Sequence, residues 1–154
     1  MVEAYFVRWA ISNVIVLTLL FLCWKYPKSG RYGFGIIFLS ASIVNFLTSM
    51  FGPQNYLEYR HFAIFEFYRT FIEGFFADHV QAIIMTIAAG QLLISIGLFY
   101  GKSLLKPAIL GGILFSAAII PLGIGAGMPV PLLMIIALVI LLRPAVQDTK
   151  NIVT

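Results

Sequence analysis

The stretch VQAIIMTIAAGQLLISIGLFYG, residues 80–101, contains no Asp, Glu, Lys or Arg, and it decides the fold class. Three further stretches, residues 9–24, 32–51 and 107–142, lack these charged residues as well. The hydrocarbon core of a bilayer is about 30 Å thick, and a helix crosses it with about 20 apolar residues. The four stretches therefore predict an all-α integral membrane protein, a polytopic membrane helical bundle.

The overall composition agrees with this class. Of the 154 residues, 61% are hydrophobic and 10% are charged, whereas a soluble domain carries about 25% charged residues. The length fits one membrane domain, residues 1–154, without a second soluble domain. The net charge of +4 comes from basic residues that flank apolar runs. Lipid headgroups explain that placement, and nucleic acid is not an expected partner.

The stretch 107–142 is too long for one crossing, because 36 helical residues would extend about 54 Å. The glycine-rich segment 123–129 supplies a turn. Pro107 is expected at a helix start, Pro144 at the end of the last helix, and residues 27–30 in a turn. We predict five transmembrane helices, at about residues 6–25, 32–51, 79–101, 105–124 and 128–143, and a polar tail at 144–154.

The loop charges give this topology an orientation. Seven of the ten basic residues fall on one predicted face. They are Lys25, Lys28, Arg31, Lys102, Lys106, Arg143 and Lys150. Cytoplasmic loops are enriched in Lys and Arg, so this face is predicted to be cytoplasmic, with the N-terminus outside and the C-terminus inside.

Residues 52–78 form the one long extramembrane segment, and they hold four of the six acidic residues. Plotted at 100° per residue, one narrow sector contains Glu58, Phe62, Glu66, Arg69 and Glu73, and the other aromatic residues lie outside it. The pattern predicts an amphipathic helix over about 57–76, with Arg69 paired to Glu66 and Glu73. Such a helix lies on the bilayer or caps the bundle; the alternative is the lid or wall of an outward pocket that uses Glu66, Arg69 and Glu73 on a ligand.

Catalytic chemistry is hard to find in this chain. No histidine or charged residue lies at mid-membrane depth, where haem ligands or proton relays would be needed. Glu58, His61, Asp78 and His79 match no metal-ligand spacing, so no metal site is expected. No catalytic residues and no cofactor are assigned. The remaining enzymatic alternative is an outward site at Glu66, Arg69, Glu73 and His79.

Two amides stand out inside the predicted spans. Asn45 and Gln91 lie near the middles of the second and third spans, and each is expected to hydrogen-bond another helix. If they face each other or a cavity, they are the best polar groups for a hydrophobic small molecule such as a lipid or quinone. That hypothesis predicts a ligand-dependent thermal shift that is lost in Gln91→Leu.

Small residues recur at helical spacing. Gly97 and Gly101, Gly123 and Gly127, and the series 108, 112 and 116 follow the small-x-x-x-small pattern that lets helices approach closely. They are expected to serve packing within the chain, with an oligomer or partner interface as the alternative. Cys23 is the only cysteine and is expected to be an apolar filler.

The stretches 32–43, YGFGIIFLSASI, and 88–98, AAGQLLISIGL, resemble the first two helices of DoxX-like membrane proteins. The resemblance covers residues 31–143 and implies that family's four-helix plan, with the first span as an addition. It also implies a prokaryotic cytoplasmic-membrane protein, accessory to quinol oxidation or to thiol-oxidant defence. Gln91 stands where the family often has a carboxylate, which argues against a proton-linked role. With one cysteine, the chain would not carry thiol chemistry itself.

Two functional hypotheses follow. The first is a non-catalytic, DoxX-like membrane subunit or scaffold beside a respiratory or redox partner, or in a homo-oligomer. The alternative is a binder or transporter of a hydrophobic small molecule, with the 57–76 helix as lid. The candidate ligand-binding residues are Asn45, Gln91, Glu66, Arg69, Glu73 and His79.

Overall fold

The computed structural model describes the backbone of residues 2–150 and the side chains of residues 6–143. All regular elements in this part of the chain are helical, which confirms the all-α prediction. The long helices are α1 (Val2–Lys25), α2 (Pro27–Phe51), α4 (Val80–Tyr100), α5 (Lys102–Ile119) and α6 (Val130–Lys150). The short ones are η1 (Pro53–His61), α3 (Glu66–Phe71), η2 (Ile72–Phe76) and η3 (Ile120–Ala126).

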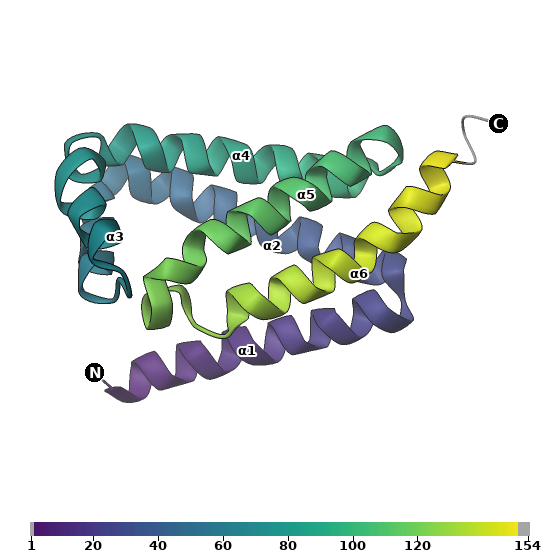
Figure 1. Ribbon diagram of the computed structural model, residues 1–154, viewed down its shortest axis with the longest axis horizontal. Coiled ribbons are helices and arrows are strands. Elements are labelled where there is room, and N and C mark those ends of the chain that lie inside the picture. The colour runs from purple at the N-terminus through teal and green to yellow at the C-terminus, as the bar shows by residue number, and fades with distance from the viewer. Residues whose placement is uncertain (1, 151–154) are drawn as a thin grey trace.

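The five long helices run back and forth between the two ends of the molecule (Figure 1). α2 packs on α1 and α4, α5 packs on α4 and α6, and α6 packs back on α1, so the helices close a ring. Fully buried side chains from four of these helices meet in its core, namely Phe34, Phe38, Leu98, Ile109 and Leu138. The N-terminal helix is therefore part of the ring and contributes Val16, Leu19 and Cys23 to this core.

Four helices are long and apolar enough to cross a membrane: Phe6–Lys25, Pro27–Phe51, Val80–Tyr100 and Lys102–Ala126. The chain is therefore an integral membrane protein. The apolar part of α6, Val130–Arg143, is shorter than these four and falls below the roughly 20 residues of a usual span. The predicted count of five spans is thus confirmed only for the first four.

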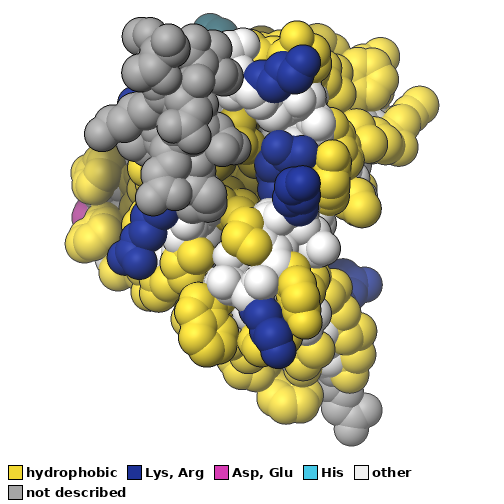
Figure 2. Space-filling view, turned by 90° about the vertical axis from the view of Figure 1, so that its right-hand side faces the viewer, with side chains coloured by type: hydrophobic (Ala, Val, Ile, Leu, Met, Phe, Trp, Pro, Cys, Tyr) yellow, Lys and Arg dark blue, Asp and Glu magenta, His cyan; other side chains and the backbone are white. Residues whose placement is uncertain are grey.

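The two ends of the ring differ in charge. At one end, which we call the basic end, α1 passes into α2 and α4 into α5, and α6 runs out toward the C-terminus. Figure 2 shows lysine and arginine side chains spread over this end. The opposite end, which we call the loop end, holds residues 52–79. The predicted gathering of basic residues on one face is therefore present.

Three proline predictions were wrong. Pro27 is the first residue of α2 and does not form a turn. The backbone N–H of a first helical residue has no partner within the helix, so proline, which lacks this N–H, is well tolerated there. The chain reverses one residue earlier, at Tyr26 (φ −133°, ψ 72°). Pro107 lies inside α5, which begins at Lys102, after a turn at Gly101. α6 continues past Pro144 to Lys150, so residues 144–150 are helical, and residues 151–154 lie outside the described part.

The single amphipathic helix predicted over 57–76 is not confirmed. η1 ends at His61, and Phe65 has an extended backbone (φ −105°, ψ 137°). Between them, the Ile64 N–H donates to the Pro121 carbonyl at 2.9 Å, so a contact with η3 replaces the helical bond. Gly74 then bends the chain again (φ −103°, ψ −107°). The segment therefore folds back over the ends of the ring helices.

Candidate ligand cavity

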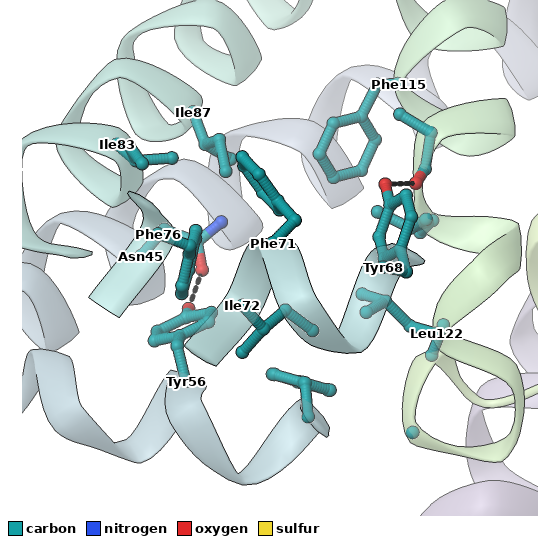
Figure 3. A pocket seen from close by; sticks show the side chains of 15 residues that line it. Asn45, Tyr56, Tyr68, Phe71, Ile72, Phe76, Ile83, Ile87, Phe115 and Leu122 are labelled. Atoms are coloured by element: carbon teal, nitrogen blue, oxygen red, sulfur yellow. Dashed lines mark hydrogen bonds between the residues drawn. The ribbon is translucent and has the colours of Figure 1, made fainter. Parts of the chain in front are cut away.

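A cavity of about 410 Å³ lies at the loop end of the ring, and we call it the aromatic cavity. The second half of α2, the first half of α4, the end of α5, η3 and the folded-back segment 53–76 enclose it (Figure 3). It is lined by Asn45, Tyr56, Tyr59, Tyr68, Phe71, Ile72, Phe76, Ile83, Ile87, Phe115, Ala118, Ile119, Leu122, Gly125 and Ala126. Cavities of 300–1,000 Å³ with mostly apolar walls are typical small-molecule sites.

The segment 53–76 is held against the ring at several points. The Tyr68 hydroxyl donates a hydrogen bond of 2.5 Å to the Ala118 carbonyl near the end of α5. Ile72 and Phe76 are buried in a second hydrophobic cluster with Val80 and Ile84 of α4. These contacts make the segment a wall of the aromatic cavity.

Asn45 and Gln91 meet at one side of this cavity. The Asn45 Nδ2 donates to Gln91 Oε1 at 2.6 Å, and the Tyr56 hydroxyl donates to Asn45 Oδ1. Gln91 is 2% exposed, while Asn45 lines the cavity. The amide pair therefore joins α2 to α4 and links the helix pair to η1 through Tyr56.

Two more hydrogen bonds extend this contact between α2 and α4. The Ser42 hydroxyl donates to the Ala88 carbonyl at 2.7 Å, and the Ser95 hydroxyl donates to the Gly35 carbonyl at 2.8 Å. Both serines are buried. The polar side chains of this helix pair thus bond within the protein, and they fix how α2 and α4 lie beside the cavity.

Burial in the cavity wall affects the pKa of two phenols, Tyr56 and Tyr68. Burial raises the pKa of Tyr68 above its ordinary value of 10.0. Burial also raises the pKa of Tyr56, with a smaller contribution from the neighbouring Tyr59, while a hydrogen bond with Thr48 acts in the opposite direction. Both hydroxyls therefore carry their hydrogen at neutral pH and act as donors.

The charged residues predicted for the site lie elsewhere. Arg69 pairs with Glu66 at 3.0 Å, as the spacing predicted, and both side chains are substantially exposed. Glu73 is exposed, and no ion pair joins it to Arg69 in the described part of the chain. His79 stacks on Phe75, with ring centroids 4.6 Å apart, and its Nδ1 lies 3.0 Å from the Phe75 carbonyl.

Of the six candidate residues, the structure joins Asn45 to Gln91 and Glu66 to Arg69, and only Asn45 lines the cavity. Among the described residues, no interaction unites the four polar residues of the enzymatic alternative. No group of three His, Cys, Asp or Glu side chains in the described part of the chain could hold a metal ion.

Sequence reasoning missed most of the cavity lining. The aromatic density of segment 52–78 was visible in the sequence, and Tyr56, Tyr68, Phe71 and Phe76 come from it. Phe115 gave no signal, because it lies in a charge-free span among other apolar residues. Sequence reasoning also missed Trp9, whose Nε1 donates to the Met128 carbonyl at 2.7 Å and fixes α1 to the turn before α6.

No known protein family, curated protein or solved structure matches this chain. What this protein does must therefore be inferred from the aromatic cavity. Its lining is mostly apolar, and Asn45 and Tyr56 place an amide and a phenol side by side in its wall.

Proposed function

We propose that this integral membrane protein binds a hydrophobic small molecule in the aromatic cavity and is not itself an enzyme. The observation that carries the proposal is the mostly apolar cavity of about 410 Å³ with the Asn45 amide and the Tyr56 phenol together in one wall. A small number of polar groups in an apolar pocket is the usual arrangement for orienting a ligand. In this proposal the segment 53–76 is the lid that covers the ligand. It does so as a folded-back wall of short helices and not as one amphipathic helix.

The surface of that segment supports entry of the ligand from the bilayer. Ile64, Phe67 and Phe75 are 59%, 68% and 59% exposed, respectively. Exposed large apolar side chains at the end of a membrane bundle fit the interfacial zone, where aromatic rings are favoured. A ligand dissolved in the lipid would therefore meet the cavity wall without crossing water.

The proposal also includes the fifth transmembrane span and the orientation of the chain in the membrane. We assign α6 as the fifth span, made shorter than usual by local thinning of the bilayer. The basic end is assigned to the cytoplasm, with the N-terminus outside and the C-terminus inside. The DoxX-like resemblance supports a prokaryotic cytoplasmic membrane, and the closed ring gives the additional first helix a structural role.

A cavity-filling substitution tests the proposal. Ile87 lines the cavity on α4, whereas Leu93 on the same helix is 69% exposed. We expect native mass spectrometry of the protein in membrane-derived nanodiscs to detect a bound neutral molecule in the wild type and in Leu93→Trp, but not in Ile87→Trp. Equal occupancy in both tryptophan variants, or none in the wild type, would contradict the proposal.

A second candidate function is a non-catalytic, DoxX-like accessory subunit of a respiratory or redox complex. The observation in its favour is Gly90 on α4, where an added Cβ would meet nothing within 4 Å. A small residue on an open helix face can admit a second membrane helix closely. Gentle purification from native membrane tests this candidate, and a solitary monomer with no associated subunit would count against it.

A further inference from the structure

The aromatic cavity has no charged side chain in its lining. Its walls contain one amide and three phenols, and the remaining lining residues are apolar. Charged residues of the same segment, such as Glu66 and Arg69, pair with each other on the exposed side. A charged ligand would need an ionic partner to enter such a site without a large desolvation penalty. The lining therefore favours a neutral ligand.

The hydrogen bonds that the cavity residues already make restrict further the chemical class of ligand that can bind. A phenol has one hydrogen to donate. Tyr56 donates its hydrogen to Asn45 Oδ1, and Tyr68 donates its hydrogen to the Ala118 carbonyl. The hydrogens of these two phenols, Tyr56 and Tyr68, therefore already have acceptors within the protein.

The Asn45 amide nitrogen has two hydrogens, and one of them bonds Gln91 Oε1. In Figure 3 this nitrogen lies toward the part of the cavity where Phe71 and Ile87 are drawn. The second amide hydrogen thus remains for a ligand. Gln91 is a positioning residue, because its bond holds the Asn45 amide in this orientation.

We infer that the ligand is a neutral lipophile with a carbonyl group, such as a long-chain ketone, aldehyde or ester, whose oxygen accepts the second Asn45 hydrogen. The apolar remainder of the molecule contacts the rings of Phe71, Phe76 and Phe115. This inference rests on the proposed function, because it specifies the chemistry of the same cavity.

Two probes with the same number of non-hydrogen atoms, undecan-2-one and dodecane, test it. Dissociation constants are measured on the purified full chain in nanodiscs. The wild type is expected to bind the ketone roughly two- to tenfold more tightly than the alkane, which is the effect of one net hydrogen bond. Asn45→Leu is expected to bind both probes alike. Ser42→Ala is the matched control, because it removes a buried bond between the same helices and leaves the cavity lining intact.

The outcomes separate the two proposals. Equal affinity of the wild type for ketone and alkane overturns the carbonyl inference alone. Binding of neither probe above the level of Ile87→Trp overturns the proposed function. Retained dodecane binding shows that Asn45→Leu is folded. If Asn45→Leu does not fold, Gln91→Leu is used in its place. Without Gln91 the Asn45 amide is no longer held in position, so the preference for the ketone over the alkane should be lost. An unchanged preference in Gln91→Leu overturns the assignment to Asn45.

Discussion

The basic end and the loop end of the ring are built in opposite ways. At the basic end the helices touch through small residues: a Cβ added to Gly97 would lie 2.6 Å from the Ala108 Cβ, and one added to Gly30 would lie 2.6 Å from the Cys23 Sγ. At the loop end, the aromatic segment 53–76 covers the ends of the ring helices, and a cavity of about 410 Å³ lies beneath it. Since lipid provides no hydrophobic drive for helix association, residue size sets how closely the helices approach.

The two ends therefore have different structural roles. The close-packed end holds the helices at fixed distances, and the loop end contains the space that the proposed ligand would occupy. Interiors are normally packed as densely as organic crystals, so a hollow of this size needs support from its own walls. The hydrogen bonds of Tyr56 and Tyr68 provide that support at the loop end.

The largest effect is expected from breaking the close contact at the basic end. In Gly97→Ala the new Cβ would also lie 3.0 Å from the Leu104 carbonyl, so α4 and α5 must separate. Overpacking of this kind lowers the free energy of unfolding by about 1–3 kcal/mol. Denaturant unfolding of the purified protein in detergent measures the change.

Gly90→Ala is the matched control, two turns earlier on the same helix. Its Cβ meets nothing within 4 Å, and replacing a helical glycine by alanine contributes up to about 1 kcal/mol of stability. The two alanine variants should therefore move the unfolding midpoint in opposite directions. If both move it equally, the basic end is not as tightly packed as described.

The sequence predicted the membrane class and the first four spans because the absence of charge over about 20 residues leaves few alternatives. It also identified Asn45 and Gln91, since amides are conspicuous in apolar spans. It did not predict the break at residues 62–65, where the tertiary bond from Ile64 to Pro121 replaces a helical one. The cavity depends on that break, so periodicity along one segment could not predict it.

An intermediate effect is expected from removing the amide pair that links α2 to α4 beside the cavity. Gln91→Leu keeps the volume and leaves Asn45 Nδ2 without its partner at 2.6 Å. Hydrogen bonds between membrane helices contribute about 1 kcal/mol, so the free energy of unfolding should fall by about that amount, and the thermal shift caused by undecan-2-one should fall to the size of the shift caused by dodecane.

Leu92→Gln is the complementary control, because this neighbouring side chain is 41% exposed and is not in the lining of the cavity. It should leave the thermal shift caused by undecan-2-one intact. Full ligand response in Gln91→Leu would mean that the pair is structural only.

The smallest effect on global stability is expected from Tyr68→Phe, which removes the bond to the Ala118 carbonyl. One hydrogen bond contributes about 0.5–1.5 kcal/mol, and much of this loss should appear as local opening of the loop end. Hydrogen exchange of the amides in residues 64–76 should become faster, while exchange in the basic half of α4 should stay unchanged. Tyr100→Phe, at a 60% exposed position on that half, is the control.

The same variant has a consequence at high pH. Burial raises the pKa of Tyr68 above 10.0, so the folded state keeps the hydrogen at pH values where the unfolded chain releases it. The contribution of this phenol to stability is therefore full below pH 10 and is lost as the pH rises through the folded-state pKa. Tyr68→Phe should show a smaller alkaline loss of stability than the wild type, with Tyr56 accounting for part of the remainder. An alkaline loss of the same size in both proteins would mean that the Tyr68 phenol is not held in a dry wall, and the contrast between the two ends would then depend on packing alone.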